Sequence, residues 1–294
     1  MSAVTEAPRL IDITPGGAEA RRRDRRRKLV RGGIVAACLA YLAVVLIGPL
    51  VGIVVSALKP GFRTLTDTLT SQDVRHAFFL TFQITAVTLL VTTTLGAVTA
   101  WVLVRHRFRG RRLMNALVDL PLAMSPVTVG IACVLLFGRG GWFMPWFSAR
   151  GIQVIFALPS MILVTIFICM PFVVRSIAPV LEELGTEEED VARTLGASTV
   201  QTLFRVILPN IRWGLFYGIA LTTARAIGEI GAVLIVSGNL KGKTETATIY
   251  VLTAFEERMD TQGYIVALTL AAISIVALGV IEVMKRRKVR EVSR

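Results

Sequence analysis

Six long apolar stretches constrain this chain more than any other feature of its sequence. They cover residues 33–58, 78–104, 113–137, 152–174, 212–236 and 263–284. Each is long enough to cross a hydrocarbon layer of about 30 Å as a helix. The core of a soluble protein rarely gathers its apolar residues in blocks this long, even where 54% of all residues are hydrophobic. The sequence therefore predicts an all-α, polytopic membrane protein with six transmembrane helices.

The basic residues predict the orientation of these helices. They concentrate in RRRDRRRKLVR (21–31), RHRFRGRR (105–112) and KRRKVR (285–290). With the N-terminus inside, the cytoplasmic segments hold 24 of the 33 Lys and Arg residues, the three outer loops hold eight, and Arg225 lies within a span. This asymmetry follows the positive-inside rule, so both termini are predicted to be cytoplasmic. A net charge of +13 can indicate nucleic acid, but basic residues placed in this way meet anionic lipid, and no nucleic-acid partner is predicted.

The first 28 residues are predicted to be a basic, disordered cytoplasmic tail, and residues 29–290 to form the transmembrane domain. Arginines before an apolar run also occur in twin-arginine export signals. The first apolar stretch, however, exceeds the apolar region of about 7–15 residues that a signal peptide contains. We therefore expect an uncleaved first helix and a multi-pass protein of the inner (plasma) membrane.

One stretch nearly matches a phosphate-binding loop. SGNLKGKT (237–244) supplies the second half of G-x-x-x-x-G-K-[ST], but Ser237 occupies the position of the first glycine. The stretch also follows a membrane helix instead of a β-strand, and the predicted topology places it outside the cell, away from ATP. The sequence therefore predicts no nucleotide site, no enzymatic activity and no cofactor in this chain. No metal site is predicted either, because the three cysteines and two histidines lack ligand spacing.

A polar segment, EELGTEEEDVARTLGASTVQTLFRVILPNIR (182–212), separates the fourth and fifth apolar stretches and has the signals of two short helices. Thr186 and Glu189 are predicted to form a capping box at the start of the first helix. Gly196 is predicted to end that helix in a left-handed conformation.

The second of these helices is predicted to begin at Ser198, capped together with Gln201, and to end at Pro209. Its apolar side chains follow a helical period on one face: Val200, Leu203, Phe204 and Ile207. A helix that lies on the inner lipid surface should be rich in Lys and Arg, whereas segment 182–212 carries six acidic residues. We therefore expect the apolar face to enter a groove of a protein partner.

The same segment resembles a motif of ABC importer permeases, E-A-A-x-x-x-G followed after nine residues by I-x-L-P. The matching positions here are Asp190, Val191, Ala192, Gly196, Val206, Leu208 and Pro209. Asp for Glu, Val for Ala and Val for Ile are the three departures from the motif. The resemblance implies that these residues form the coupling helix and its support, which insert into a cleft of a separate ATPase subunit that binds ATP-Mg.

Three further stretches resemble sulfate and molybdate permeases: LPLAMSPVTVG (120–130), ARAIGEIGAVLIVSGN (224–239) and GKTETATIYV (242–251). The last of them is closer to the CysW-type than to the CysT-type subunit of sulfate/thiosulfate importers. The resemblance implies the type I ABC importer permease fold and transport of sulfate or thiosulfate, with molybdate or tungstate as the alternative. It also implies a second, CysT-like permease subunit, two ABC ATPase subunits and an extracytoplasmic sulfate-binding protein. An ion-coupled secondary transporter is less favoured, because the chain shows no repeated motif.

Three ionisable residues lie within the predicted spans. Asp119 is near the cytoplasmic end of the third span, whereas Arg225 and Glu229 are four residues apart on one face of the fifth. Because charges at this depth are costly, they usually pair or face a cavity. Two interpretations stay open: a structural ion pair, or a pair that lines the path of the anion.

Prolines and glycines mark where the third and fifth spans depart from regular helix. Pro121 and Pro126 predict a kink in the third span, and Pro126 is a candidate pathway residue together with the Arg225–Glu229 pair. Gly228 and Gly231 are interpreted as small residues that let helices pack closely.

Overall fold

The computed structural model describes the backbone of residues 17–292 and the side chains of residues 30–279. Within that part of the chain the structure is entirely helical, with helices joined by turns and loops and no strand, as the sequence predicts. The chain divides into two compact units, residues 1–53 and 54–294.

The first unit is one helical run. Helix α1 (Gly17–Leu42) continues through a π-helical turn, η1 (Ala43–Ile47), into α2 (Gly48–Leu58), whose last residues belong to the second unit. Residues 17–28 are therefore helical, where the sequence predicted a disordered tail, and residues 1–16 lie outside the described part of the chain. Arg and Lys are good helix formers, so the basic segment extends the apolar helix that follows it. The run Val30–Leu58 is long and apolar enough to span a membrane, in agreement with the prediction of a first span at 33–58.

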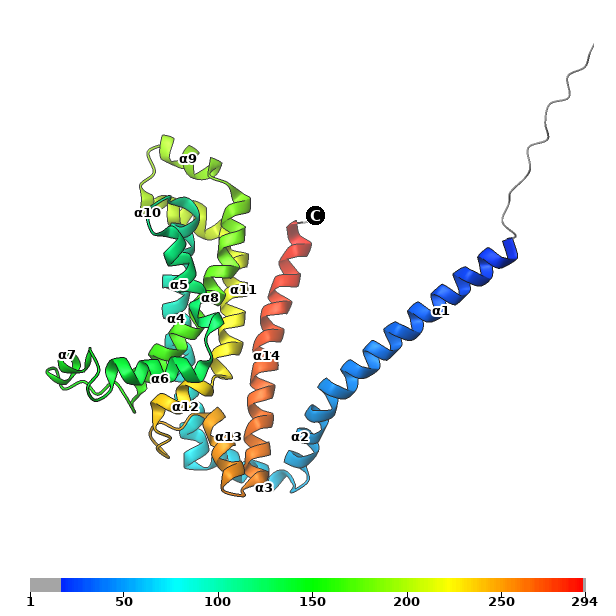
Figure 1. Ribbon diagram of the computed structural model, residues 1–294, viewed down its shortest axis with the longest axis horizontal. Helices are drawn as coiled ribbons and strands as arrows, with labels where there is room; N and C mark the ends of the chain where they lie inside the picture. Colours follow the sequence, from blue (N-terminus) through cyan, green and yellow to red (C-terminus); the bar gives the residue numbers. More distant parts are fainter. Residues whose placement is uncertain (1–16, 293–294) are drawn as a thin grey trace, which may run out of the picture. The chain divides into compact units, whose positions relative to one another are not determined.

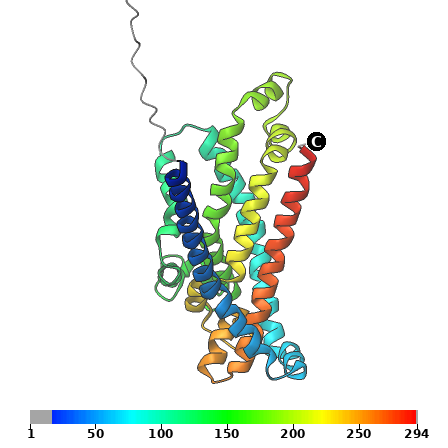
Figure 2. The ribbon, with the colours of Figure 1, turned by 90° about the vertical axis from the view of Figure 1, so that its right-hand side faces the viewer.

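Four long helices form the frame of the second unit. They are α4 (Gln72–Arg105), α8 (Leu158–Leu184), α11 (Leu208–Ile227) and α14 (Asp260–Val292). Helix α8 packs against both α4 and α11, and α14 packs against α11; Figures 1 and 2 show them as adjacent, similarly directed columns.

Small residues set the spacing of these helices. A Cβ atom on Gly96 of α4 would lie 2.8 Å from the side chain of Val173, and one on Gly214 of α11 would lie 2.7 Å from the carbonyl oxygen of Ser176. Close approach through small residues is how helices pack in lipid, where burial from water supplies no driving force.

Two of the predicted spans are broken. The third consists of α5 (Arg111–Ala123) and α6 (Pro126–Phe137), bent by 115°, and the fifth passes from α11 into α12 (Gly231–Ser237) with a bend of 53°. Figure 1 shows α6 running across the direction of α5. The kink predicted from the two prolines is confirmed, and it is a complete break. Counting each broken pair once, the described residues contain six candidate spans.

The two ends of the second unit differ in their short helices. At one end, called the α9 end, lie α9 (Glu187–Thr194), α10 (Thr199–Thr202) and the π-helical turn η2 (Leu203–Ile207). The opposite end, called the α13 end, holds α3 (Phe62–Thr70) and α13 (Ala247–Glu256). The C-terminal part of α14 lies toward the α9 end (Figures 1 and 2).

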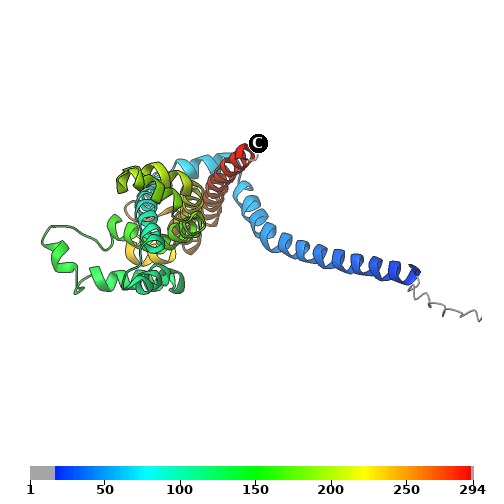
Figure 3. The same ribbon diagram turned by 90° about the horizontal axis from the view of Figure 1, so that it is seen from above.

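A loop that contains α7 (Met144–Ser148) projects sideways from the bundle, as Figures 1 and 3 show. After this loop the fourth span does not follow its predicted bounds of 152–174. Helix α8 begins at Leu158 and continues to Leu184. The prediction ended at the first charged residue, but the helical backbone continues past it with its buried face still apolar.

Candidate functional site

The α9 end is fixed to the bundle by a buried ion pair. The Nε atom of Arg105, at the end of α4, lies 2.7 Å from Oε1 of Glu189 in α9, and the two side chains are only 8% and 6% exposed. Arg105 also donates from a terminal guanidinium nitrogen to the carbonyl of Gly185 at 2.5 Å. The capping box predicted for Thr186 and Glu189 is therefore wrong: Thr186 makes no side-chain capping bond, and the Glu189 carboxylate pairs with Arg105 instead.

The turn between α9 and α10 follows the predicted chemistry. Gly196 has a φ of +85°, its N–H donates to the carbonyl of Arg193, and the N–H of Ala197 donates to Ala192, both at 3.0 Å. Only glycine adopts this left-handed conformation without strain, so the prediction for Gly196 is confirmed.

The capping box predicted at the start of the second short helix is also confirmed. The Ser198 hydroxyl accepts from the N–H of Gln201 at 3.3 Å, and the Gln201 side chain accepts from the N–H of Ser198 at 2.8 Å. These two bonds satisfy backbone donors that would otherwise lack partners at a helix start.

Pro209 does not end the second helix, contrary to the prediction. The backbone passes from α10 through η2 directly into α11, where Pro209 occupies the first turn. In a regular helix the proline ring would collide with the carbonyl of Arg205, four residues earlier. The wider π-helical turn precedes Pro209 and accommodates it. As a result α10 is continuous with the helix of the fifth span.

Apolar side chains point outward at the α9 end. Val191, Leu195, Val200 and Phe204 are exposed, Leu195 by 82%. Of the predicted apolar face of the second helix, Val200 and Phe204 are therefore free to meet a partner, whereas Ile207 is buried in the core of the bundle. We call these four exposed residues the α9–α10 apolar surface. Such exposed side chains in a cluster are typical of a site that binds a protein.

The two halves of the predicted motif meet at one cavity of about 520 Å³. Ala192 from the first half and Val206 from the second line it together. Of the other motif residues, Leu208 is half-buried and Asp190 and Pro209 are exposed. Asn210 and Glu188 also line the cavity, and the side-chain amide of Asn210 donates a hydrogen bond to Glu188. The cavity borders the α9–α10 apolar surface.

Arg225 and Glu229 are in contact, as their spacing predicts, but they stand at the break between α11 and α12. Arg225 is in the last turn of α11, and Glu229 lies in the break itself. Glu229 is nearly fully buried, its carboxylate accepts from the N–H of Ala232 at 2.9 Å, and its carbonyl accepts from the Thr248 hydroxyl at 2.9 Å. The side chain of Arg225 is 29% exposed. Glu229 thus holds the start of α12, while Arg225 keeps an accessible positive charge.

The two breaks lie against each other. A Cβ atom on Gly231, the first residue of α12, would be 3.0 Å from Cβ of Pro126, the first residue of α6. Gly130 likewise brings α6 against Ala232, whose carbonyl oxygen would lie 2.9 Å from an added Cβ. Close packing explains Gly231 as predicted; Gly228 faces only its own helix, at 3.4 Å from the Ala224 carbonyl.

The sequence reasoning missed the partner of Asp119. Arg175 of α8 donates from Nε to Oδ1 of Asp119 at 2.8 Å and from a terminal nitrogen to Oδ2 at 2.5 Å, and it also donates to Asn115 at 2.9 Å. The predicted fourth span ends at residue 174, one position before Arg175, so Arg175 falls outside the predicted helix. The signal that could have found it is the run of apolar residues that resumes after it.

The stretch that nearly matches a phosphate-binding loop closes on itself at the α13 end. The Thr244 hydroxyl donates to the carbonyl of Ser237 at 2.7 Å and accepts from the N–H of Leu240 at 3.1 Å. The ammonium group of Lys241 pairs with Glu257 at 2.5 Å. These groups are therefore engaged within the protein.

An apolar helical bundle with two broken spans and an outward apolar surface on short helices at one end defines a membrane permease subunit. The chain belongs to the family described as binding-protein-dependent transport system inner membrane components, whose model matches residues 92–290. It is accordingly a multi-pass protein of the inner (plasma) membrane.

Two permeases of known name and one solved structure are similar to this chain over most of its length. The sulfate transport system permease protein CysW of Synechocystis sp. is 41% identical over 254 residues, which cover 86% of this chain and 92% of the relative. The sulfate transport system permease protein CysT of Escherichia coli is 32% identical over the same shares of both chains. In fold, the chain is similar to a bacterial ABC transporter involved in the import of the acidic polysaccharide alginate, with a TM-score of 0.75 at 16% identity, covering 91% of this chain and 99% of that one.

Proposed function

We propose that this chain is a permease subunit of an ATP-driven ABC importer for sulfate and thiosulfate. The main support is its 41% identity, over nearly the whole relative, to a sulfate transport system permease of the CysW type. The chain itself would form half of the translocation pathway and hold no nucleotide site or cofactor; ATP-Mg would be bound by the partner ATPase.

The α9–α10 apolar surface is proposed to couple transport to ATP hydrolysis. It would insert into a groove of the ATPase, with Val191, Leu195 and Phe204 as anchors. Two rigid connections lead inward from it: the Arg105–Glu189 ion pair to α4, and the continuous helix through Pro209 to α11. Motion of the ATPase subunits would therefore displace α4 and α11, and α11 ends at the break beside Arg225.

The proposal includes further subunits. One chain presents only one side of a pathway, so a second permease subunit is expected, and the 32% identity to a CysT-type protein favours a partner of that type. Two ATPase subunits are expected, one of which would bind at the α9 end of this chain; that end is then cytoplasmic together with the C-terminal part of α14. A sulfate-binding protein would deliver the anion at the α13 end.

Sulfate uptake tests this function directly. Cells that lack their own sulfate permease, given this chain with its partner subunits, should accumulate radiolabelled sulfate only when ATP is available. An excess of unlabelled thiosulfate should reduce this uptake, whereas molybdate and tungstate should not. Strong competition by molybdate would assign the importer to that anion instead. Uptake that follows an ion gradient without ATP would contradict the ABC assignment.

For Arg225 and Glu229 we propose a role in the anion path. Arg225 is the partly exposed member of the pair, and its charge would attract a dianion where few other polar groups are available. The variant Arg225→Met/Glu229→Gln removes both charges but keeps an amide oxygen that can accept from Ala232. We expect normal abundance, assembly and ATPase stimulation, but low sulfate uptake. Full uptake in this variant would leave the pair a structural role only.

A further inference from the structure

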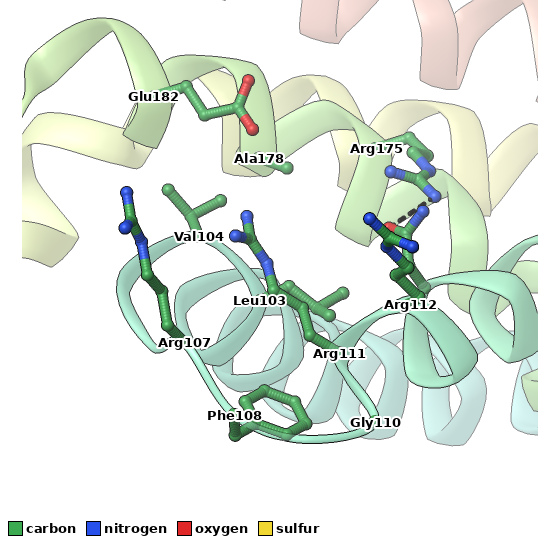
Figure 4. Close-up of a pocket in the computed structure, with 11 residues that line it drawn as sticks. Leu103, Val104, Arg107, Phe108, Gly110, Arg111, Arg112, Arg175, Ala178 and Glu182 are labelled. Carbon is green, nitrogen blue, oxygen red and sulfur yellow. Dashed lines mark hydrogen bonds between the residues drawn. The ribbon is translucent and has the colours of Figure 1, made fainter.

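A cavity of about 630 Å³ opens at the α9 end, between α4, α5 and α8. Four arginines line it, together with one amide and one carboxylate: Arg107, Arg111, Arg112, Arg175, Asn115 and Glu182. Figure 4 shows the guanidinium groups of Arg107 and Arg111 on the side of the cavity nearer Glu182, with Arg112 and Arg175 on the other side in this view.

Most of this positive charge lacks a partner in the protein. Arg175 is paired with Asp119, but among the residues that the structure describes, the side chains of Arg107, Arg111 and Arg112 make no hydrogen bond or ion pair. Four guanidinium groups face the Glu182 carboxylate and the Asp119 carboxylate behind Arg175, so two positive charges remain unbalanced. Like charges gathered in one concavity repel one another, and a bound dianion would remove this repulsion.

The positive-inside rule alone does not explain the arrangement. Orientation in the membrane requires only that basic residues lie on the cytoplasmic side. Here the loop between α4 and α5 places Arg107, together with Arg111 and Arg112 from the start of α5, in the lining of one cavity. Arg109 of the same loop is exposed, as Arg107 and Arg112 are, but does not line the cavity. The chain therefore provides its own control, a neighbouring arginine of equal charge outside the cavity.

We propose that this cavity binds a tetrahedral dianion of the sulfate or phosphate class. Guanidinium groups bind such oxyanions through paired, charge-assisted hydrogen bonds, and three unpaired guanidinium groups can surround one anion. The Asn115 side chain, already oriented by its bond to Arg175, can contribute from the adjoining wall. The anion can be free in solution or be the phosphomonoester headgroup of a lipid such as phosphatidic acid.

The experiment measures binding to the assembled importer in nanodiscs, without binding protein and without nucleotide. In discs of phosphatidylcholine alone, radiolabelled sulfate and radiolabelled inorganic phosphate are titrated onto the wild type, the triple variant Arg107→Gln/Arg111→Gln/Arg112→Gln, and the control Arg109→Gln. In discs that also contain phosphatidic acid, native mass spectrometry counts retained lipid for the same three proteins.

The wild type and Arg109→Gln should bind the anion equally, and the triple variant should bind it at least about tenfold more weakly, because each lost guanidinium removes charge-assisted bonds. Saturable sulfate or phosphate binding in phosphatidylcholine identifies the free anion as the ligand. Retention of phosphatidic acid without binding of free anion identifies the headgroup.

Three results would overturn the proposal: no binding in either kind of disc, equal binding by the triple variant, or equal loss in Arg109→Gln. Should the triple variant fail to assemble, Arg107→Gln and Arg111→Gln singly take its place against the same control. The cytoplasmic position of the cavity rests on the proposed function, but the binding measurement requires no transport. An importer of another solute would fail the uptake test and still bind phosphate here.

Discussion

The α9 end and the α13 end of the second unit each hold an ion pair, and the two pairs differ in how deeply they are buried. At the α9 end the Arg105–Glu189 ion pair is buried, with exposures of 8% and 6%, while large apolar side chains such as Leu195 lie outside. At the α13 end the Lys241–Glu257 ion pair is exposed, at 51% and 42%, and apolar side chains such as Val74 and Val266 are inside. The buried pair therefore fixes the geometry of an end whose large apolar side chains are exposed.

The largest loss of stability is expected when the buried Arg105–Glu189 ion pair is broken. Glu189→Ala leaves the Arg105 guanidinium buried without its counter-charge, which costs about 3–5 kcal/mol in comparable sites. We expect α9 to detach, with faster proteolysis of segment 182–198 and loss of the ATPase in a pull-down, while the spans still insert.

Two companion variants separate the pair from general effects of charge. Glu187→Ala removes an exposed carboxylate of the same helix and should retain the ATPase. The double variant Arg105→Met/Glu189→Met replaces the pair by apolar groups and should recover much of the lost stability. Intact α9 and normal ATPase retention in Glu189→Ala would contradict the anchoring role.

The next effect concerns the turn at Gly196. A valine there would have to adopt a φ near +85°, which costs about 1–2 kcal/mol or more for a residue with a branched Cβ. We expect Gly196→Val to insert normally but to lose sulfate uptake and ATPase binding. Gly196→Asn, which tolerates this conformation better, should keep part of both. Equal loss in the two variants would mean that strain in the backbone is not the cause.

The sequence predicts features of this fold whose causes are local. The Ser198–Gln201 cap, the left-handed Gly196 and the break at Pro126 each depend on residues a few positions apart, and all three are present. Helices long enough to span a membrane are likewise predictable. The bilayer core contains no water, so each span must satisfy its backbone hydrogen bonds within its own segment.

What the sequence does not predict are partners that lie far apart along the chain. Glu189 has the spacing of a capping residue, and nothing local indicates that Arg105, 84 positions earlier, takes its carboxylate. Arg175 and Asp119 are 56 positions apart. Hydropathy ends the predicted fourth span at residue 174, although the helix that contains Arg175 continues to Leu184. The sequence predicts a helix end at Pro209, because a π-helical turn cannot be recognised from residue types alone.

A smaller effect, dependent on pH, is expected at the α13 end. Glu245 is nearly completely buried, and burial raises the pKa of its carboxyl group above the ordinary value of 4.5. A hydrogen bond with Thr253 and the charge of Lys241 oppose this shift in part, and the charges of Asp73 and Glu257 add to it. A carboxyl group whose pKa is raised by folding destabilises the folded state once the pH exceeds its ordinary value, because the folded state then opposes ionisation. Glu245→Gln should therefore raise the Tm at neutral pH, and the gain should shrink as the pH falls toward 4.5. Glu256→Gln, at an exposed position, should have no effect at either pH.

The smallest effect is expected from the exposed pair, and it is the sharpest test of the contrast between the two ends. The Lys241 ammonium lies 2.5 and 2.7 Å from the two carboxylate oxygens of Glu257, closer than Arg105 lies to Glu189, so distance alone would rank this pair above the buried one. Exposure predicts that it contributes least to stability, because water and salt screen both charges. When one partner is removed, water solvates the other. Lys241→Met should therefore leave the Tm within error of the wild type and of Lys243→Met, the matched exposed lysine of the same loop, at low and at high salt. A loss of stability comparable to that of Glu189→Ala would show that contact distance, not burial, decides the strength of ion pairs in this protein.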